Sequence, residues 1–282
     1  MKLQKVLADA TLKLSRSGID GAARDARILT AYSLEVPMSQ LSLKIDEQVS
    51  EKIISKLEQL ILRRINREPI SKILERREFW GRTFSINKNV LDPRGDTETL
   101  IDFVIDKPVK SVLDLGTGSG AIAVTLACEW KEANVTAIDI SEDALALAER
   151  NAEKFNVKNK INFLKSDWFD AVEGLFDLII ANPPYIGLME QGKISPEVIK
   201  YDPEIALFAG SDGLDAYRKI IPSLAKFLNP EGFVVLEIGA SQSNQVKDLM
   251  NSSGFFDLKT VKDLSGKDRL IAAKLTLSLI HI

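Results

Sequence analysis

The chain has 282 residues, of which 45% are hydrophobic, and its formal net charge is only −3. This balance argues against a protein whose main affinity comes from coating a nucleic-acid backbone, and the single cysteine, Cys128, excludes an internal disulfide. Residues 1–18 lack the apolar block of a signal peptide, and no stretch reaches the roughly 20 apolar residues of a membrane span. We therefore expect a cytoplasmic protein that does not associate with membranes.

The N-terminal part of the chain is predicted to be a small helical bundle. Up to about residue 74 the apolar residues recur at helical spacing, as at Leu3, Leu7 and Leu14, and Ser50 is placed to cap the helix that follows it. Residues 78–89 then alternate apolar and polar side chains around Gly81, which predicts a hairpin or a short paired strand.

Beyond residue 110 the pattern changes to alternating strands and helices. Strand-like runs are found at 111–116, 134–139, 161–167, 176–184 and 232–239, and helical runs at 121–130, 142–155, 216–228 and 242–250. Such alternation predicts a mostly parallel sheet with helices on both faces, and ligands of these sheets bind at the carboxyl ends of the strands. Four segments follow from these patterns: 1–76 as a helical domain, 77–92 as a hairpin or linker, 93–274 as the sheet domain, and 275–282 as an irregular tail.

A glycine-rich turn, "DLGTGSG" from Asp114 to Gly120, follows the first of these strands and opens a helix. Its glycines allow a ligand to approach backbone N–H groups at a helix N-terminus. The spacing is G-x-G-x-G and differs from the G-x-G-x-x-G of pyrophosphate-binding turns. Without a phosphate to hold, the acidic Asp114 can favour a cationic amino group or a sulfonium.

Acidic residues end the next two strands. Asp139 lies about 20 residues after the glycine turn, where a carboxylate can hold the two hydroxyls of a ribose. The alternative is an N-cap for the following helix, although Ser141 suits that role better. Asp167 could accept a hydrogen bond from an adenine amino group beside Trp168, whose indole or backbone would wall the ring; Trp168 as ordinary core remains the alternative.

The fourth strand ends in Asn182-Pro183-Pro184-Tyr185. Two prolines remove two backbone donors and leave nearby carbonyls pointing outward, while Asn182 adds one acceptor and two donors. The motif therefore predicts a rigid cluster of hydrogen-bond acceptors with Tyr185 as a lid, and a plain turn is the alternative.

These four strand ends together resemble those of class I S-adenosylmethionine-dependent methyltransferases, which have a Rossmann-like α/β sheet. N-P-P-Y is similar to the motif of enzymes that methylate planar nitrogens. The order of "EPISKIL", "EFWG", "DTE", "DLGTGSG", "DWF" and "NPPY" resembles the release factor glutamine methyltransferase family, HemK or PrmC, up to about Lys274.

The resemblance implies transfer of a methyl group from S-adenosyl-L-methionine to the glutamine of the Gly-Gly-Gln motif of peptide chain release factors, leaving S-adenosyl-L-homocysteine. Residues 93–274 would be the methyltransferase domain, and the N-terminal helices would select the substrate. The implied cofactor contacts are Asp114, Gly116, Thr117, Gly118, Ser119, Gly120, Asp139, Asp167, Trp168 and Asn182. The implied catalytic and substrate-binding residues are Asn182, Pro183, Pro184 and Tyr185. We expect a monomer that binds neither a metal nor, stably, nucleic acid.

The chain departs from the family pattern at two places. It has Pro93-Arg94-Gly95 where the family usually has P-R-P before the D/E-T-E motif, which predicts a looser loop before Glu98. The tail 275–282, which holds the only histidine, His281, follows no family pattern, and we expect no catalytic role for it.

Three further functions remain open from the sequence. N-P-P-Y also serves enzymes that methylate exocyclic amines of adenine or guanine in nucleic acids, although the pI near 5.5 argues against them. A nicotinamide-dependent dehydrogenase would require the other glycine spacing and a catalytic histidine, and a non-catalytic cofactor-binding regulator would have little use for N-P-P-Y.

A group of arginines forms either a docking surface for an acidic partner or a solvated face. Its members are Arg63, Arg64, Arg67, Arg76, Arg77 and Arg82.

Overall fold

The computed structural model describes residues 1–274, so the predicted tail 275–282 and His281 lie outside the described residues. The chain divides into two compact units. Unit 1 contains Met1–Glu75 together with Ser195–Tyr201, and unit 2 contains Arg76–Ile194 and the chain from Asp202 onward. Within residues 1–274, no helix combines the length and the apolar character needed to cross a bilayer.

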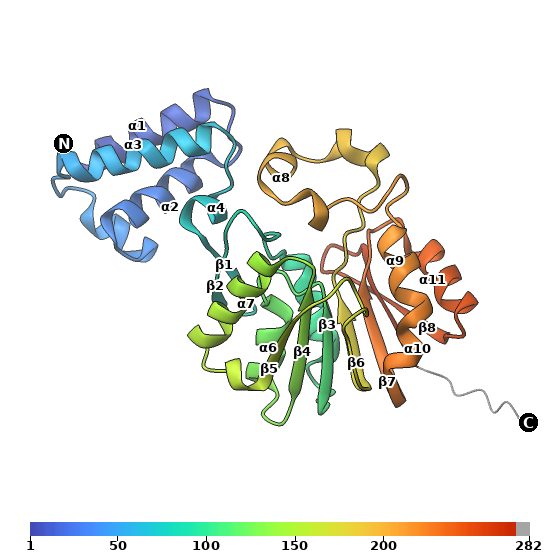
Figure 1. Ribbon diagram of the computed structural model, residues 1–282. Coiled ribbons are helices and arrows are strands. Elements are labelled where there is room, and N and C mark those ends of the chain that lie inside the picture. Colours follow the sequence, from blue (N-terminus) through green and yellow to red (C-terminus); the bar gives the residue numbers. More distant parts are fainter. Residues whose placement is uncertain (275–282) are drawn as a thin grey trace, which may run out of the picture. The chain divides into compact units, whose positions relative to one another are not determined.

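Unit 1 is built from helices, as the periodicity predicts (Figure 1). Its N-terminal elements are α1 (Leu3–Arg16), α2 (Ala22–Leu34), the 3-10 helix η1 (Met38–Lys44), α3 (Glu51–Ile65) and α4 (Ile70–Leu74). On α1, Leu3, Val6, Ala10 and Leu14 are buried, because a spacing of three or four residues brings side chains to one face. The predicted cap of α3 is confirmed: the Ser50 hydroxyl accepts a hydrogen bond from the Ile53 N–H at 3.4 Å.

A short helix from the second half of the chain, α8 (Pro196–Tyr201), belongs to unit 1. Its Glu197 carboxylate lies 3.7 Å from the Arg64 guanidinium and 3.6 Å from that of Arg67. The Tyr201 hydroxyl donates a hydrogen bond to the Asn66 carbonyl at 2.8 Å. From the sequence, this segment is predicted to belong to the 93–274 domain, because ion pairs between distant segments leave no periodic signal in the chain.

Unit 2 begins with the predicted hairpin, formed by β1 (Arg76–Phe79) and β2 (Arg82–Ser85), which pair antiparallel around Gly81. A seven-stranded sheet follows, in the order β5-β4-β3-β6-β7-β9-β8. Its strands are β3 (Ser111–Leu115), β4 (Asn134–Asp139), β5 (Ile161–Lys165), β6 (Phe176–Ala181), β7 (Leu228–Glu237), β8 (Phe256–Lys262) and β9 (Asp268–Lys274). The helices are α5 (Glu98–Val104), α6 (Ala121–Glu129), α7 (Glu142–Lys154), α9 (Asp215–Ile220), α10 (Leu224–Phe227) and α11 (Ser243–Ser252). Short 3-10 turns complete the unit: η2 (Gly95–Thr97), η3 (Lys158–Lys160), η4 (Leu188–Lys193), η5 (Glu204–Ala206) and η6 (Ile221–Ser223).

The five strands β3 to β7 are parallel, which confirms the predicted mostly parallel α/β sheet. The strand order reverses between β3 and β6, so the carboxyl ends of β3, β4, β5 and β6 meet at one edge, beside this switch point. The antiparallel strands β8 and β9 are missing from the sequence-based prediction.

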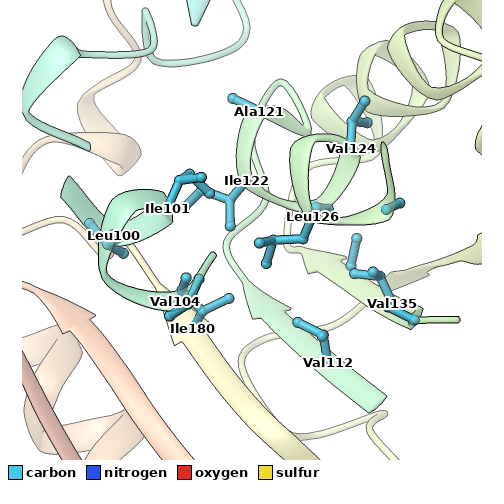
Figure 2. Close-up of a cluster of buried hydrophobic side chains, with 14 of the residues drawn as sticks. Leu100, Ile101, Val104, Val112, Ala121, Ile122, Val124, Leu126, Val135 and Ile180 are labelled. Carbon is cyan, nitrogen blue, oxygen red and sulfur yellow. The ribbon is translucent and has the colours of Figure 1, made fainter. Parts of the chain in front are cut away.

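Each face of the sheet is covered by helices, because successive side chains of a strand point to opposite sides. Leu178 and Ile180 of β6 pack into a cluster with α5 and α6, and Figure 2 shows this face. Ile179 and Ala181 of β6 pack into a second cluster with side chains of α9, α10 and α11. The continuous apolar run of this strand is thus explained by burial on both faces.

One predicted helix is wrong in detail. The run 216–228 is not a single helix: α9 ends at Ile220, the 3-10 turn η6 contains Pro222, and α10 ends at Phe227. Pro222 lacks a backbone N–H and interrupts regular α-helical hydrogen bonding. Leu228, the last residue of the predicted helix, begins β7.

Candidate active site

A cavity of about 410 Å³ lies at the carboxyl ends of the parallel strands, within unit 2. This volume falls in the range typical of small-molecule and cofactor pockets. Ten of the predicted site residues line it: Gly116, Thr117, Gly118, Ser119, Asp139, Asp167, Trp168, Asn182, Pro183 and Pro184. Three other predicted residues, Asp114, Gly120 and Tyr185, are not among its lining residues.

Asp139 connects the end of β4 with the glycine turn after β3. Its Oδ2 accepts a hydrogen bond from the Gly118 N–H at 2.9 Å, and its Oδ1 accepts one from the Ser141 N–H at 2.9 Å. The N-cap role belongs to Ser141, whose hydroxyl accepts from the Ala144 N–H at 3.2 Å. Burial raises the pKa of Asp139, and the backbone hydrogen bonds oppose this rise.

Asp114 stabilises the glycine turn and the start of α6 through hydrogen bonds. Its carboxyl group is fully buried, and its Oδ2 accepts hydrogen bonds from the Thr117 hydroxyl at 2.7 Å and from the Ala123 N–H at 3.2 Å. Its Oδ1 is buried and has no hydrogen-bond partner among the described residues. Burial raises the pKa of Asp114 to about 7.

Asp167 and Trp168 line the cavity after β5. Trp168 has a φ of 50°, in the left-handed region, and it also packs against the cluster of α9 and α11. This side chain therefore lines the cavity and also packs against the core, and its contact with an adenine ring stays a prediction. The Asp167 carboxylate lies 3.8 Å from the Lys219 amine, and Lys219 lines the same cavity.

Asn182 follows β6, and its side chain is held by a residue far away in the sequence. The Asn182 Nδ2 donates a hydrogen bond to the Thr97 hydroxyl at 3.1 Å. Thr97 is buried, belongs to the "DTE" motif and lines the cavity. Its neighbour Glu98 accepts a hydrogen bond from the Trp80 N–H at 2.8 Å, which ties this segment to the β1–β2 hairpin.

Tyr185 is turned toward a buried polar group that the sequence analysis misses. Its hydroxyl donates to the Glu237 Oε1 at 3.4 Å, and its carbonyl accepts from the Gln242 Nε2 at 2.8 Å. Glu237 ends β7 and is fully buried. Burial raises the pKa of Glu237 to about 7 and also raises that of Tyr185. A lone carboxylic acid in the apolar run "VVLEIG" is the sequence signal that points to Glu237.

The arginine group offers little free positive charge. Five of its members lie in ion pairs, with nitrogen-to-oxygen distances from 2.6 to 3.7 Å. The pairs are Arg63 with Glu68, Arg64 with Asp25, Arg67 with Glu197, Arg77 with Asp92, and Arg82 with Glu129. These ion pairs neutralise part of the positive charge of the group, and its role as a docking surface or as a solvated face stays a prediction.

The sequence and fold agree with those of known methyltransferases. Residues 86–204 match the family model described as Methyltransferase small domain, and residues 5–74 match the one described as PrmC N-terminal domain. The catalytic domain of hMettl16, solved with an RNA hairpin, has a TM-score of 0.58 and 19% identity over 74% of this chain and 80% of that one. This likeness supports the fold of the methyltransferase class.

Relatives that match nearly the whole of this chain define its family. A release factor glutamine methyltransferase of Cereibacter sphaeroides is 41% identical over 275 residues, which are 98% of this chain and 99% of that protein. A bifunctional methyltransferase of Rickettsia conorii is 39% identical over 95% of this chain, which spans only 57% of that longer protein. The chain belongs to the release factor glutamine methyltransferase family.

Proposed function

We propose that the protein transfers the methyl group of S-adenosyl-L-methionine to the side-chain amide nitrogen of the glutamine in the Gly-Gly-Gln motif of peptide chain release factors. The observation that carries this proposal is the position of Asn182, Pro183 and Pro184 on the same cavity as Asp139 and the glycine turn. The names of the full-length relatives support the release factor as substrate.

The cavity has features that fit this cofactor. Gly116 and Gly118 have positive φ, and nothing lies within 4 Å of a Cβ built on Gly118, so the turn leaves room for a ligand. The Asp139 carboxylate can accept from ribose hydroxyls beside its two backbone donors, because each oxygen has two lone pairs. Trp168 and Ile140 supply apolar surface for an adenine ring. The cofactor, when bound, supplies an electrophilic methyl group on a sulfonium.

Asn182 and Pro183 would hold the substrate amide. An amide nitrogen is a poor nucleophile, since its lone pair is delocalised into the carbonyl. Acceptance of its two N–H groups by the Asn182 amide oxygen and the Pro183 carbonyl would orient the nitrogen and favour the positive charge that develops on it. A strong general base is then unnecessary, because the protonated amide product is highly acidic. The contact of Tyr185 with the substrate amide remains a prediction.

The N-terminal helices would select the release factor, since the cavity itself offers only space for the cofactor and a glutamine side chain. Unit 1 would therefore affect the KM for the protein substrate more than the affinity for the cofactor. A monomeric state and a cytoplasmic location also remain predictions.

The test is transfer of labelled methyl from S-adenosyl-L-methionine to a purified release factor. Parallel reactions contain a release factor with its Gly-Gly-Gln glutamine replaced, total RNA, and DNA. We expect label on the intact release factor alone, and Asn182→Ala should reduce turnover by about 100-fold or more. Label on RNA or DNA alone would overturn the proposed substrate and favour a nucleic-acid methyltransferase.

A further inference from the structure

The turn that carries Trp168 has a backbone conformation that requires support. Trp168 has a φ of 50°, in the left-handed region, which residues with a Cβ adopt only at an energetic cost. Its indole lies against the glycine turn, because a Cβ built on Gly116 would be 3.9 Å from the Trp168 Cζ3. A costly backbone conformation persists only where surrounding contacts enforce it. The position of the indole therefore depends on the contacts that close this turn.

Ser166 supplies two of these contacts through one hydroxyl group. Its Oγ donates a hydrogen bond to the Trp168 carbonyl at 2.8 Å and accepts one from the Ala171 N–H at 3.0 Å. The Ser166 N–H donates to the Asp139 carbonyl at 3.1 Å, which ties the turn to the end of β4. Ser166 is buried, so its hydrogen bonds are shielded from competing water. One side chain thus closes the turn around Trp168.

The Ser166 hydroxyl is engaged within the protein, although Ser166 also lines the cavity. A serine hydroxyl has a single proton, and here that proton is bonded to the Trp168 carbonyl. A hydrogen bond donated from Ser166 to a ligand would therefore break the turn. We propose that Ser166 is a positioning residue, which holds the Trp168 indole against the glycine turn as a preformed wall for the adenine ring of the cofactor.

The inference rests on the proposed function, in which S-adenosyl-L-methionine occupies the cavity. If the turn samples other conformations, only the fraction with the indole in place binds the cofactor well, and the apparent Kd rises in inverse proportion to that fraction. This effect passes through the indole, so a protein without the indole should no longer depend on the Ser166 hydroxyl. That dependence separates positioning from a direct contact between Ser166 and the cofactor.

The test is a double-mutant cycle of Ser166→Ala and Trp168→Ala, with the affinity for S-adenosyl-L-methionine measured by calorimetry. Tryptophan emission of each free protein is recorded as a second readout. Ser111→Ala is the matched control. The Ser111 hydroxyl accepts from the Asp177 N–H at 3.0 Å at the start of β3, and Ser111 is not among the residues that line the cavity.

We expect Ser166→Ala to raise the Kd by about 5- to 20-fold in the wild-type background, and by less than about twofold when Trp168 is already alanine. Ser111→Ala should leave the Kd within about twofold of the wild-type value. Ser166→Ala should also shift the tryptophan emission of the free protein to longer wavelength, because the indole becomes more exposed to water. This shift should be absent in the Trp168→Ala background.

Two results would overturn the inference. If Ser166→Ala binds the cofactor as tightly as wild type, the hydroxyl does not position the indole. If it weakens binding equally in both backgrounds, Ser166 acts on the cofactor directly or through the fold as a whole. A wild-type protein that binds the cofactor but does not label a release factor would instead reject the proposed substrate and leave this cycle to decide the role of Ser166.

Discussion

The Asp139 carboxylate at the end of β4 accepts a hydrogen bond from the Gly118 N–H, in the turn after β3, at 2.9 Å. One side chain thus fixes the neighbouring turn and faces the cavity in which the cofactor is proposed to bind.

Replacement of Asp139 should therefore weaken cofactor binding. Hydrogen bonds to a charged group contribute about 1.5–3 kcal/mol, so Asp139→Ala is expected to raise the Kd for S-adenosyl-L-methionine by about 10- to 100-fold. Asp139→Asn, which keeps one acceptor oxygen, should have a smaller effect. Isothermal titration calorimetry measures both values, and an unchanged Kd in Asp139→Ala would remove this residue from the cofactor site.

Two glycines of the same turn should respond differently to alanine. A Cβ on Gly120 would lie 3.0 Å from the Ala148 Cβ and 3.2 Å from its Cα, and φ is +79°. We expect Gly120→Ala to destabilise the protein by about 1–3 kcal/mol in denaturant unfolding, from crowding and backbone strain. Gly118 also has positive φ but open space around a Cβ, so Gly118→Ala should cost about 1 kcal/mol in stability and mainly reduce cofactor affinity. Equal losses of stability in the two variants would contradict this distinction.

Gly95 is a position where proline should be accepted. It opens the 3-10 turn η2, and a Cβ there would have no neighbour within 4 Å. The preceding Arg94 has φ −97° and ψ 145°, the extended geometry that residues before proline prefer. Gly95→Pro should raise stability by about 0.4–1 kcal/mol, through a less flexible unfolded chain. Thermal unfolding beside Gly95→Ala tests this, and a lower Tm for the proline variant would show that the loop needs another conformation.

The pH dependence of the free energy of unfolding should report the raised pKa of Glu237. Its pKa rises from 4.5 to about 7 on folding because of burial, so the folded state binds the proton more tightly than the unfolded state. Its contribution to stability is therefore complete below about pH 4.5 and lost as the pH rises toward 7, by on the order of 3 kcal/mol. Denaturant unfolding at several pH values should show wild type losing more stability over this range than Glu237→Gln. Asp114 titrates in the same direction in both proteins, so the difference between the two curves isolates Glu237. Parallel curves would contradict the raised pKa.

Much of the fold can be predicted from the sequence because its signals are local. Ser50 and Ser141 are caps that a few neighbouring residues specify, and both are confirmed. The parallel core strands carry continuous apolar runs, of which residues 178–181 are an example, since both of their faces are buried. The edge strand Phe256–Lys262 is largely exposed and has no such run, which explains why it is missed.

The site is predicted only where its residues stand at strand ends. Asn182 and Asp139 follow directly from that rule. Thr97 does not, because it belongs to no strand and lies 85 positions from Asn182, the residue that it contacts. Glu237 does end a strand, but its contact with Tyr185, 52 positions away, leaves no local signal. Gln242, which donates to the Tyr185 carbonyl, is hidden for the same reason.

The presence of α8 in unit 1 has a consequence for engineering the enzyme. The chain passes from one unit to the other after residue 75, and again on each side of residues 195–201. Only residues 186–194 separate Tyr185 from this 195–201 segment. A single cut after residue 75 would remove the partners of Glu197 and Tyr201 and leave α8 without the helices that it packs on. A chimaera that exchanges the N-terminal domain to change substrate choice must therefore carry a matching 195–201 segment with it, grafted only a few residues downstream of the N-P-P-Y motif.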